Sequence, residues 1–153
     1  MRINGLLQLE DIIPELSSET KDLVLDELAA KVAQRHSGVD RAELLNILLE
    51  RERLGSTGIG DGIAIPHGKL KRLAKPILAF GRSLKGVDFN ALDGRKAQLF
   101  FLLLAPEDAV GVHLKMLARI SRILKDPGVR KDLLAAPDAA AIFEVIREQD
   151  CRY

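Results

Sequence analysis

The segment from Gly55 to Gly68, GSTGIGDGIAIPHG, is the most informative stretch of this 153-residue chain. It contains five of the twelve glycines and one of the three histidines. Glycine adopts positive φ at little steric cost, so such a segment can turn sharply and present backbone N–H groups. Residues 63–65 predict a short buried strand, and Pro66 fixes φ immediately before His67. We therefore expect an imidazole held rigidly beside polar backbone, which is a setting for chemistry on a ring nitrogen.

Before this segment the pattern predicts helices, and after it the pattern predicts strands followed by further helices. Strands are expected over residues 76–84 and 97–104, and the second is almost wholly apolar, as is typical of a central strand covered on both faces. This order favours an α+β fold: a single domain with a mixed β-sheet between helices on both faces, a three-layer α/β/α arrangement. A helix is expected over 21–35, with Ser17 and Ser18 as its N-cap, and a second from an Asp40 capping box to about residue 54. After the strands, helices are expected over 110–125, in a short segment to about 135, and after 138.

Composition favours a protein with neither a nucleic-acid partner nor a membrane segment. The formal net charge is +1, and the longest apolar run, residues 99–105, is too short to span a bilayer. Cys151 is the single cysteine, so no internal disulfide can form. The N-terminus lacks the basic start and long apolar stretch of a signal peptide. We expect a cytoplasmic protein.

A nucleotide-binding loop is the first alternative that the glycines raise, and the spacing argues against it. A Walker A loop has four residues between its first glycine and Gly-Lys-Ser/Thr, whereas five residues separate Gly62 from Gly68, and Leu70 stands where the hydroxyl belongs. Gly58, Gly60 and Gly62 do not match the dinucleotide-binding fingerprint either, because the spacing to the third glycine is wrong. They also precede a predicted strand instead of following one.

A metal site and a covalent site are the remaining chemical alternatives. No HExxH or CxxC motif is present, although His67, His113 and Asp61 could meet in space as ligands. Alternatively, neutral His67 could act as a nucleophile that carries a phosphoryl group. Backbone N–H groups, an arginine or a helix N-terminus would then stabilise the phosphoryl oxygens, and His113 lies in the first turn of its predicted helix.

Each of these residues also has a structural interpretation. A histidine that follows a strand is often a surface residue, and His113 shares the apolar side of its helix with core positions. A cluster of basic residues follows His67, and it is either a solvated surface or a docking site for an acidic partner. The cluster consists of Lys69, Lys71, Arg72 and Lys75.

Residues 56–68 closely resemble the active-site signature of the IIA domains of the mannitol/fructose class, which belong to the phosphoenolpyruvate-dependent phosphotransferase system. The nitrogen-regulatory branch of that family is especially similar. The resemblance extends through most of the chain, from residues 48–52 (LLERE) to residues 113–119 (HLKMLAR) and the helices after them. It implies one IIA domain of type 2 over residues 1–153, with a mixed sheet between helical layers.

The resemblance implies that His67 accepts a phosphoryl group from the phosphohistidine of an HPr-like carrier protein, without metal or cofactor. Arg51 matches the arginine that stabilises this group, and His113 matches the second active-site histidine, which hydrogen-bonds near the phosphorylated ring. The residues that would form the phosphoryl-binding loop are Thr57, Gly58, Asp61 and Gly68.

Two roles are compatible with this chemistry. A free-standing chain of this size favours a nitrogen or metabolic regulator, whose partners are the carrier and regulatory proteins. The alternative is a fructose- or mannitol-type component that passes the phosphoryl group to a IIB domain in sugar uptake. A third hypothesis, a binding module that has lost phosphorylation, is disfavoured because Arg51, His67 and His113 are all present.

Overall fold

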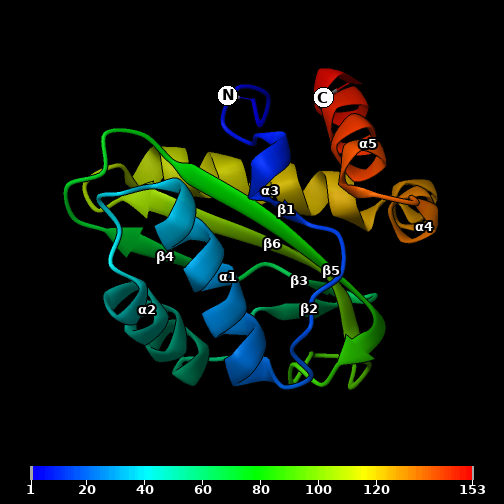
Figure 1. Ribbon diagram of the computed structural model, residues 1–153, viewed down its shortest axis with the longest axis horizontal. Coiled ribbons are helices and arrows are strands. Elements are labelled where there is room, and N and C mark those ends of the chain that lie inside the picture. Colours follow the sequence, from blue (N-terminus) through cyan, green and yellow to red (C-terminus); the bar gives the residue numbers. More distant parts are fainter. Residues whose placement is uncertain (1, 153) are drawn as a thin grey trace.

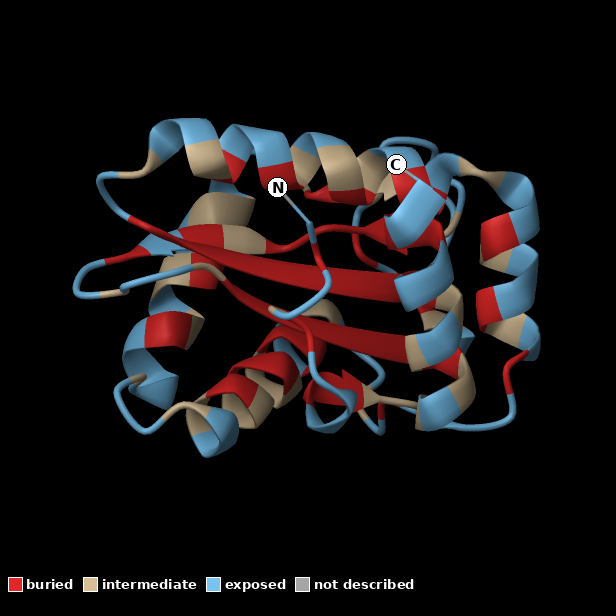
Figure 2. Cartoon of the chain, turned by 90° about the horizontal axis from the view of Figure 1, so that it is seen from above, coloured by how far each residue is buried: buried red, intermediate tan, exposed pale blue. Residues whose placement is uncertain are grey.

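The computed structural model describes residues 2–152 as a six-stranded mixed sheet between two layers of helices (Figures 1 and 2). This confirms the expected three-layer arrangement. Helices α1 and α2 pack on one face of the sheet, and α3, α4 and α5 pack on the other. The helices are α1 (Lys21–Arg35), α2 (Arg41–Arg53), α3 (Val110–Lys125), α4 (Pro127–Ala135) and α5 (Ala139–Arg152), preceded by the short helix η1 (Leu9–Asp11).

The long strands β5 (Ile77–Val87) and β6 (Ala97–Pro106) form the antiparallel centre of the sheet. Side chains alternate between the faces of a strand, and β6 follows this rule while remaining apolar on both sides. Leu99, Phe101 and Leu103 enter the core under α3, whereas the even-numbered residues between them enter the core under α1 and α2. Figure 2 shows the resulting buried strands between the helical layers. A strand covered on both faces needs this continuous apolar run.

Four short strands complete the sheet, and their order is β1-β5-β6-β3-β2, with β4 pairing to β6 beside β3. Strands β3 and β4 are two pieces of one path along β6: Ile63 pairs with Leu99, and His67 pairs with Leu103, both in parallel. Pro66 lies at the break between the pieces. The short strands are β1 (Ile12–Ile13), β2 (Gly58–Gly60), β3 (Ile63–Ala64) and β4 (His67–Leu70).

The structure corrects the sequence prediction around the glycine segment. Gly58–Gly60 is a strand that pairs antiparallel with β3, so part of the expected loop is a β-hairpin. His67 does not merely follow a strand but begins β4, which the sequence pattern does not predict because only four residues pair there. Asp61 and Gly62 form the tip of the hairpin, and both adopt positive φ, 57° and 78°. The turn therefore needs a residue that tolerates the left-handed region at each position.

The helix predictions over 21–35 and 110–125 are confirmed to the residue. The expected cap of α1 is wrong. Thr20 caps this helix through its hydroxyl, which accepts from the N–H of Leu23. The backbone N–H groups of Ser17 and Ser18 instead bind the carboxylate of Glu27, which lies about two turns into the helix. Asp40 caps α2 as expected, accepting from the N–H of Glu43.

The two ends of the described chain lie side by side and hold α3 in place (Figure 1). The buried carboxylate of Asp150 accepts from the N–H groups of Ile3 and Asn4, at 3.0 and 2.7 Å. The same carboxylate binds Nε of Arg119 in α3 at 2.5 Å. This cluster fixes the helix whose first turn carries His113.

Candidate active site

His67 begins β4 at the edge of the sheet, and its ring orientation is set by the backbone two residues earlier. Its Nδ1 lies 2.8 Å from the carbonyl oxygen of Ile65. A carbonyl oxygen only accepts hydrogen bonds, so Nδ1 carries the proton of the neutral ring. Nε2 is then left with its lone pair. The break between β3 and β4 thus selects one tautomer and leaves Nε2 as the unprotonated ring nitrogen.

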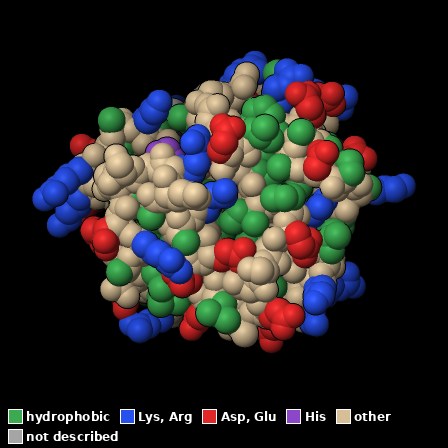
Figure 3. Space-filling view, in the orientation of Figure 1, with side chains coloured by type: hydrophobic (Ala, Val, Ile, Leu, Met, Phe, Trp, Pro, Cys, Tyr) green, Lys and Arg blue, Asp and Glu red, His purple; other side chains and the backbone are tan. Residues whose placement is uncertain are grey.

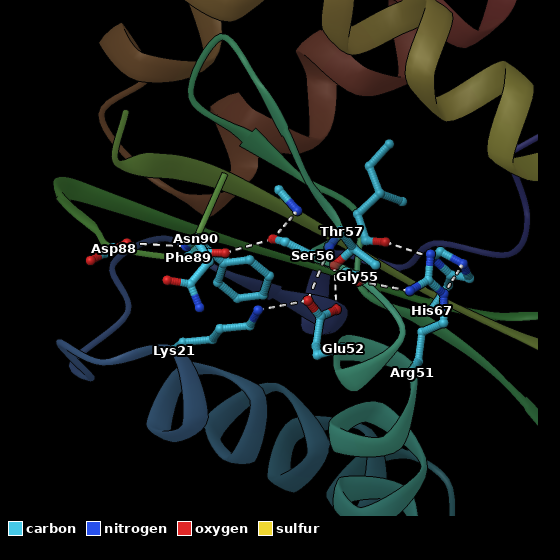
Figure 4. A network of polar contacts seen from close by, with 12 residues as sticks. Lys21, Arg51, Glu52, Gly55, Ser56, Thr57, His67, Asp88, Phe89 and Asn90 are labelled. Carbon is cyan, nitrogen blue, oxygen red and sulfur yellow. Dashed lines mark hydrogen bonds and ion pairs between the residues drawn. The ribbon is translucent and has the colours of Figure 1, made fainter. Parts of the chain in front are cut away.

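Arg51 lies in the last turn of α2 and reaches past the sheet edge to that nitrogen (Figure 4). Its Nε donates to Nε2 of His67 at 3.2 Å, and its Nη1 donates to the carbonyl oxygen of Gly55 at 2.8 Å. The planar guanidinium is therefore held at two points. A cation at a helix C-terminus is also favoured by the helix dipole.

His113 approaches His67 from α3, on the opposite helical layer from Arg51. The two ring centroids are 5.2 Å apart, and the ring planes are inclined at 58°. His113 is buried, and its Nδ1 is the buried side-chain nitrogen in residues 2–152 that has no hydrogen-bond partner. A buried polar atom without a partner is costly, so its retention indicates a role other than stability.

Both imidazoles have a pKa below the ordinary value, which favours the neutral ring. Burial lowers the pKa of His67 below its ordinary 6.5, and the positive charge of Arg51 acts in the same direction. The carbonyl of Ile65 and the carboxylate of Glu52 oppose this shift. Burial also lowers the pKa of His113, with further contributions from the neighbouring His67, Lys69 and Arg51. The protonated His113 ring would place a second N–H where no acceptor lies.

The loop residues expected to bind a phosphoryl group mostly have their N–H groups engaged elsewhere. The N–H of Thr57 binds the carboxylate of Glu52, that of Gly58 binds the hydroxyl of Ser56, and that of Asp61 binds the carboxylate of Asp93. Asp61 is also remote from the histidines. Ile63 and His67 pair with residues of β6 that are four positions apart, which is about 13 Å along that strand, and Asp61 lies beyond Ile63.

Gly68 follows His67 in β4 and allows α2 to approach the sheet closely. A Cβ atom on Gly68 would lie 2.7 Å from Cγ2 of Ile47, which is closer than packed carbon atoms come. Gly68 therefore contributes to the distance between the α2 helix, which carries Arg51, and the strand that carries His67. It is needed here for close packing and not for a positive φ.

Large apolar side chains are exposed at the end of the helix that carries Arg51 and on the helix that carries His113. Leu54 follows α2 with 84% of its surface exposed, and Val110 and Leu114 flank His113 on α3 at 50% and 60%. Exposed large apolar side chains around a reactive group are typical of a protein-docking surface. On the face seen in Figure 3, positive and negative side chains are interspersed around a central group of hydrophobic side chains.

Over residues 2–152, no three His, Cys, Asp or Glu side chains come together as a metal site, so His67, His113 and Asp61 do not form the ligand set considered above. Within the same range, every helix is too short or too polar to cross a bilayer.

The family model for the EIIA 2 component of the phosphoenolpyruvate-dependent sugar phosphotransferase system matches residues 5–149. The chain belongs to this EIIA type 2 family. Among curated EIIA relatives, a nitrogen regulatory protein of Bradyrhizobium diazoefficiens is 47% identical over 95% of each chain. A fructose-specific EIIABC component of Bacillus subtilis is 40% identical over 98% of this chain, which corresponds to 24% of the longer protein.

Solved EIIA structures have the same fold. The nitrogen regulatory protein IIA-Ntr from Neisseria meningitidis superposes with a TM-score of 0.88 at 32% identity, covering 94% of this chain and 98% of that one. The complex of enzyme IIA-mannitol with phosphorylated enzyme IIB-mannitol from Escherichia coli superposes with a TM-score of 0.78 at 23% identity, covering 93% and 97%. In that complex, a mannitol IIA protein of this fold is bound to its phosphorylated IIB partner.

Sequence reasoning did not identify two residues beside the EIIA site, Lys21 and Glu52. Glu52 lies one turn after the buried Leu48 on α2, and Lys21 lies one turn before the buried Leu25 on α1. A charged residue that continues a buried stripe is the signal that could have identified both. Their side chains form an ion pair at 2.9 Å.

Proposed function

We propose that this protein accepts a phosphoryl group on Nε2 of His67 from the phosphohistidine of an HPr-like carrier, and that it acts as a nitrogen or metabolic regulator. One observation carries the chemical part of the proposal. In the Nδ1–H tautomer, Nε2 of His67 is unprotonated, and its lone pair accepts from Nε of Arg51 at 3.2 Å. A neutral nucleophile beside a fixed guanidinium suits in-line phosphoryl transfer.

The transfer balances without a metal or an added base. Nε2 of His67 forms a bond to phosphorus while the nitrogen–phosphorus bond to the carrier histidine breaks, and the carrier nitrogen keeps the electron pair. Nδ1 keeps its proton and its hydrogen bond to Ile65 throughout. Once Nε2 is bonded, it no longer accepts from Arg51, so the guanidinium donates to the phosphoryl oxygens. We infer that His113 faces the same group from the side of α3.

The regulatory role is supported by the relatives rather than by the site. The relative that is 47% identical along nearly its whole length is a nitrogen regulatory protein. The 40% identity to a fructose-specific component favours the alternative, a sugar-uptake component that passes the group to a IIB domain. Both roles place the protein in the cytoplasm, where phosphoenolpyruvate supplies the carrier.

Phosphorylation would regulate binding through local charge. The new charge of about −2 would lie between the end of α2 and the start of α3, which carry the exposed apolar side chains of Leu54, Val110 and Leu114. Burying such a charge in an apolar interface is costly, so we infer that regulatory targets bind the unphosphorylated form. The carrier and a IIB domain would use the same face, because they must reach His67.

The test is incubation with phosphoenolpyruvate, enzyme I and an HPr-type carrier, followed by intact mass measurement. We expect an acid-labile phosphoryl adduct that is absent in His67→Ala and present in the control His36→Ala, which changes a histidine at the end of α1. No adduct with any carrier would contradict the proposal. Rapid loss of the adduct to an added IIB protein would favour the sugar-uptake alternative over the regulator.

A further inference from the structure

We propose that Glu52 is a positioning residue for phosphoryl transfer: its carboxylate, bound by Lys21 and Thr57, fixes both the guanidinium of Arg51 and the ring of His67. The inference rests on the proposed function, since it assigns these residues to the transfer at His67. Figure 4 shows the network that carries it.

The carboxylate of Glu52 is nearly buried and uses both of its oxygens. One oxygen accepts from the N–H of Thr57 at 3.0 Å and pairs with Nζ of Lys21 at 2.9 Å. The other accepts from the hydroxyl of Thr57 at 2.5 Å. Only 6% of the Glu52 side chain is exposed, and Nζ of Lys21 also lies 4.7 Å above the ring of Phe89. A carboxylate with this many donors is fixed in position.

The first consequence concerns Arg51. Glu52 stabilises the turn after α2 through two contacts. Its backbone carbonyl accepts from the N–H of Gly55 at 3.0 Å, and its carboxylate accepts from the N–H of Thr57. The carbonyl oxygen of Gly55 thereby has a fixed position, and it accepts from Nη1 of Arg51 at 2.8 Å. Since a guanidinium is planar, anchoring Nη1 sets the direction in which Nε donates, and Nε points at His67.

The second consequence concerns His67. The carbonyl oxygen of Thr57 accepts from the N–H of Ile65 at 3.0 Å, and the carbonyl oxygen of Ile65 accepts from Nδ1 of His67 at 2.8 Å. Glu52 is therefore joined to the nucleophile through two residues, and to the guanidinium through the turn. The two paths end on the two nitrogens of one ring: Nδ1 through Ile65, and Nε2 through Arg51.

Thr57 consequently has a different role from the one expected from the sequence. Its N–H, hydroxyl and carbonyl are all used inside the protein, and none is free for a phosphoryl oxygen. It connects Glu52 to the strand before His67. Ser56 supports the same turn from the other side, because its hydroxyl donates to the carbonyl oxygen of Phe89 at 2.6 Å.

The test measures transfer from a phosphorylated carrier in rapid-quench kinetics, together with the tautomer of His67 in ¹⁵N NMR spectra. For Glu52→Gln we expect kcat to fall about tenfold to a hundredfold, as a misplaced catalytic group does, while KM for the carrier stays within about twofold. We also expect the Nδ1–H tautomer to lose its dominance. The matched control is Glu50→Gln, which removes an exposed carboxylate from the same helical turn.

A second pair of variants changes Thr57 and leaves the charge of Glu52 in place. Thermal unfolding of each variant shows whether it is folded. Thr57→Val removes only the hydroxyl and should lower kcat severalfold, and Thr57→Ser should restore it. Wild-type kcat in both Glu52→Gln and Thr57→Val, with an unchanged tautomer, would overturn the inference. If instead the wild-type protein forms no adduct, the proposed function fails, while the tautomer comparison still decides whether Glu52 positions His67.

Discussion

Nε of Arg51 donates to Nε2 of His67 across 3.2 Å, so a cation at the end of a helix faces the lone pair of a neutral imidazole. This contact joins the α1/α2 layer to the edge of the sheet. It has two effects that the site needs. It disfavours protonation of the ring, because two positive charges would then be adjacent. It also places donors where the oxygens of a group bonded to Nε2 would lie.

Arg51→Lys should therefore slow phosphoryl acceptance strongly. A lysine ammonium cannot reach Nε2 of His67 and the carbonyl of Gly55 with one rigid fork, so the donor directed at the phosphoryl group is lost. We expect a decrease of about 10²–10³-fold in the transfer rate constant, as for the loss of one transition-state donor. The matched control, Arg53→Lys, alters an exposed arginine of the same turn and should transfer at the wild-type rate. A decrease below tenfold for Arg51→Lys would contradict this role.

The pH dependence of acceptance follows from the lowered pKa of His67. The pKa of the ring lies below its ordinary value of 6.5, so the rate constant should hold as the pH falls from about 8 toward neutrality and should decrease only as the pH falls through the lowered pKa. The charged and titratable neighbours are Arg51, Glu52 and His113. An NMR titration of the ring protons gives the midpoint directly. Arg51→Met should move that midpoint upward, and a wild-type midpoint at or above 6.5 would contradict the expectation.

The lowered pKa values of His67 and His113 also make the folded protein less stable in acid. Because the folded pKa values of His67 and His113 lie below the unfolded value of 6.5, the unfolded chain binds more protons in acid. Their contribution to the free energy of unfolding is present above pH 6.5 and is lost as the pH falls toward the folded pKa values. Denaturant titrations at several pH values give the free energy of unfolding of wild type and His113→Leu. Below pH 6.5 this free energy should fall less steeply with decreasing pH in the variant than in wild type.

The sequence predicted the layers of the fold better than the contacts of the candidate site. Long periodic segments identify α1 and α3 without tertiary information, and the glycine segment identifies His67. Arg51 and His113 came from the family resemblance, because α2 and α3 meet His67 only in the fold. β4 escaped prediction because its partner strand begins thirty residues later and four residues carry no clear alternation. Glu52 escaped because its partners, Lys21 and Thr57, lie on other elements.

His113→Leu should separate stability from activity. Nδ1 of His113 is buried without a partner, and such an atom costs about 1–3 kcal/mol, so leucine should leave the free energy of unfolding unchanged or raise it. Phosphoryl transfer should nevertheless slow by roughly tenfold or more, because the ring that borders His67 is gone. His36→Leu serves as the control with the same change of residue. A variant that is both destabilised and fully active would contradict the interpretation of His113.

Gly68→Ala tests whether close packing of α2 on β4 sets the position of Arg51. The added Cβ would lie 2.7 Å from Cγ2 of Ile47, so this side chain or the helix that carries it must shift, at a cost of about 1–3 kcal/mol in the free energy of unfolding. Gly38→Ala is the control, since nothing lies within 4 Å of its Cβ position. Combining Gly68→Ala with Ile47→Ala removes the clashing methyl group, so the double variant should lose less stability than the sum of the singles. It should also recover transfer, because α2 can return Arg51 to His67. Strict additivity, with transfer unaffected in all three, would show that this packing does not control the site.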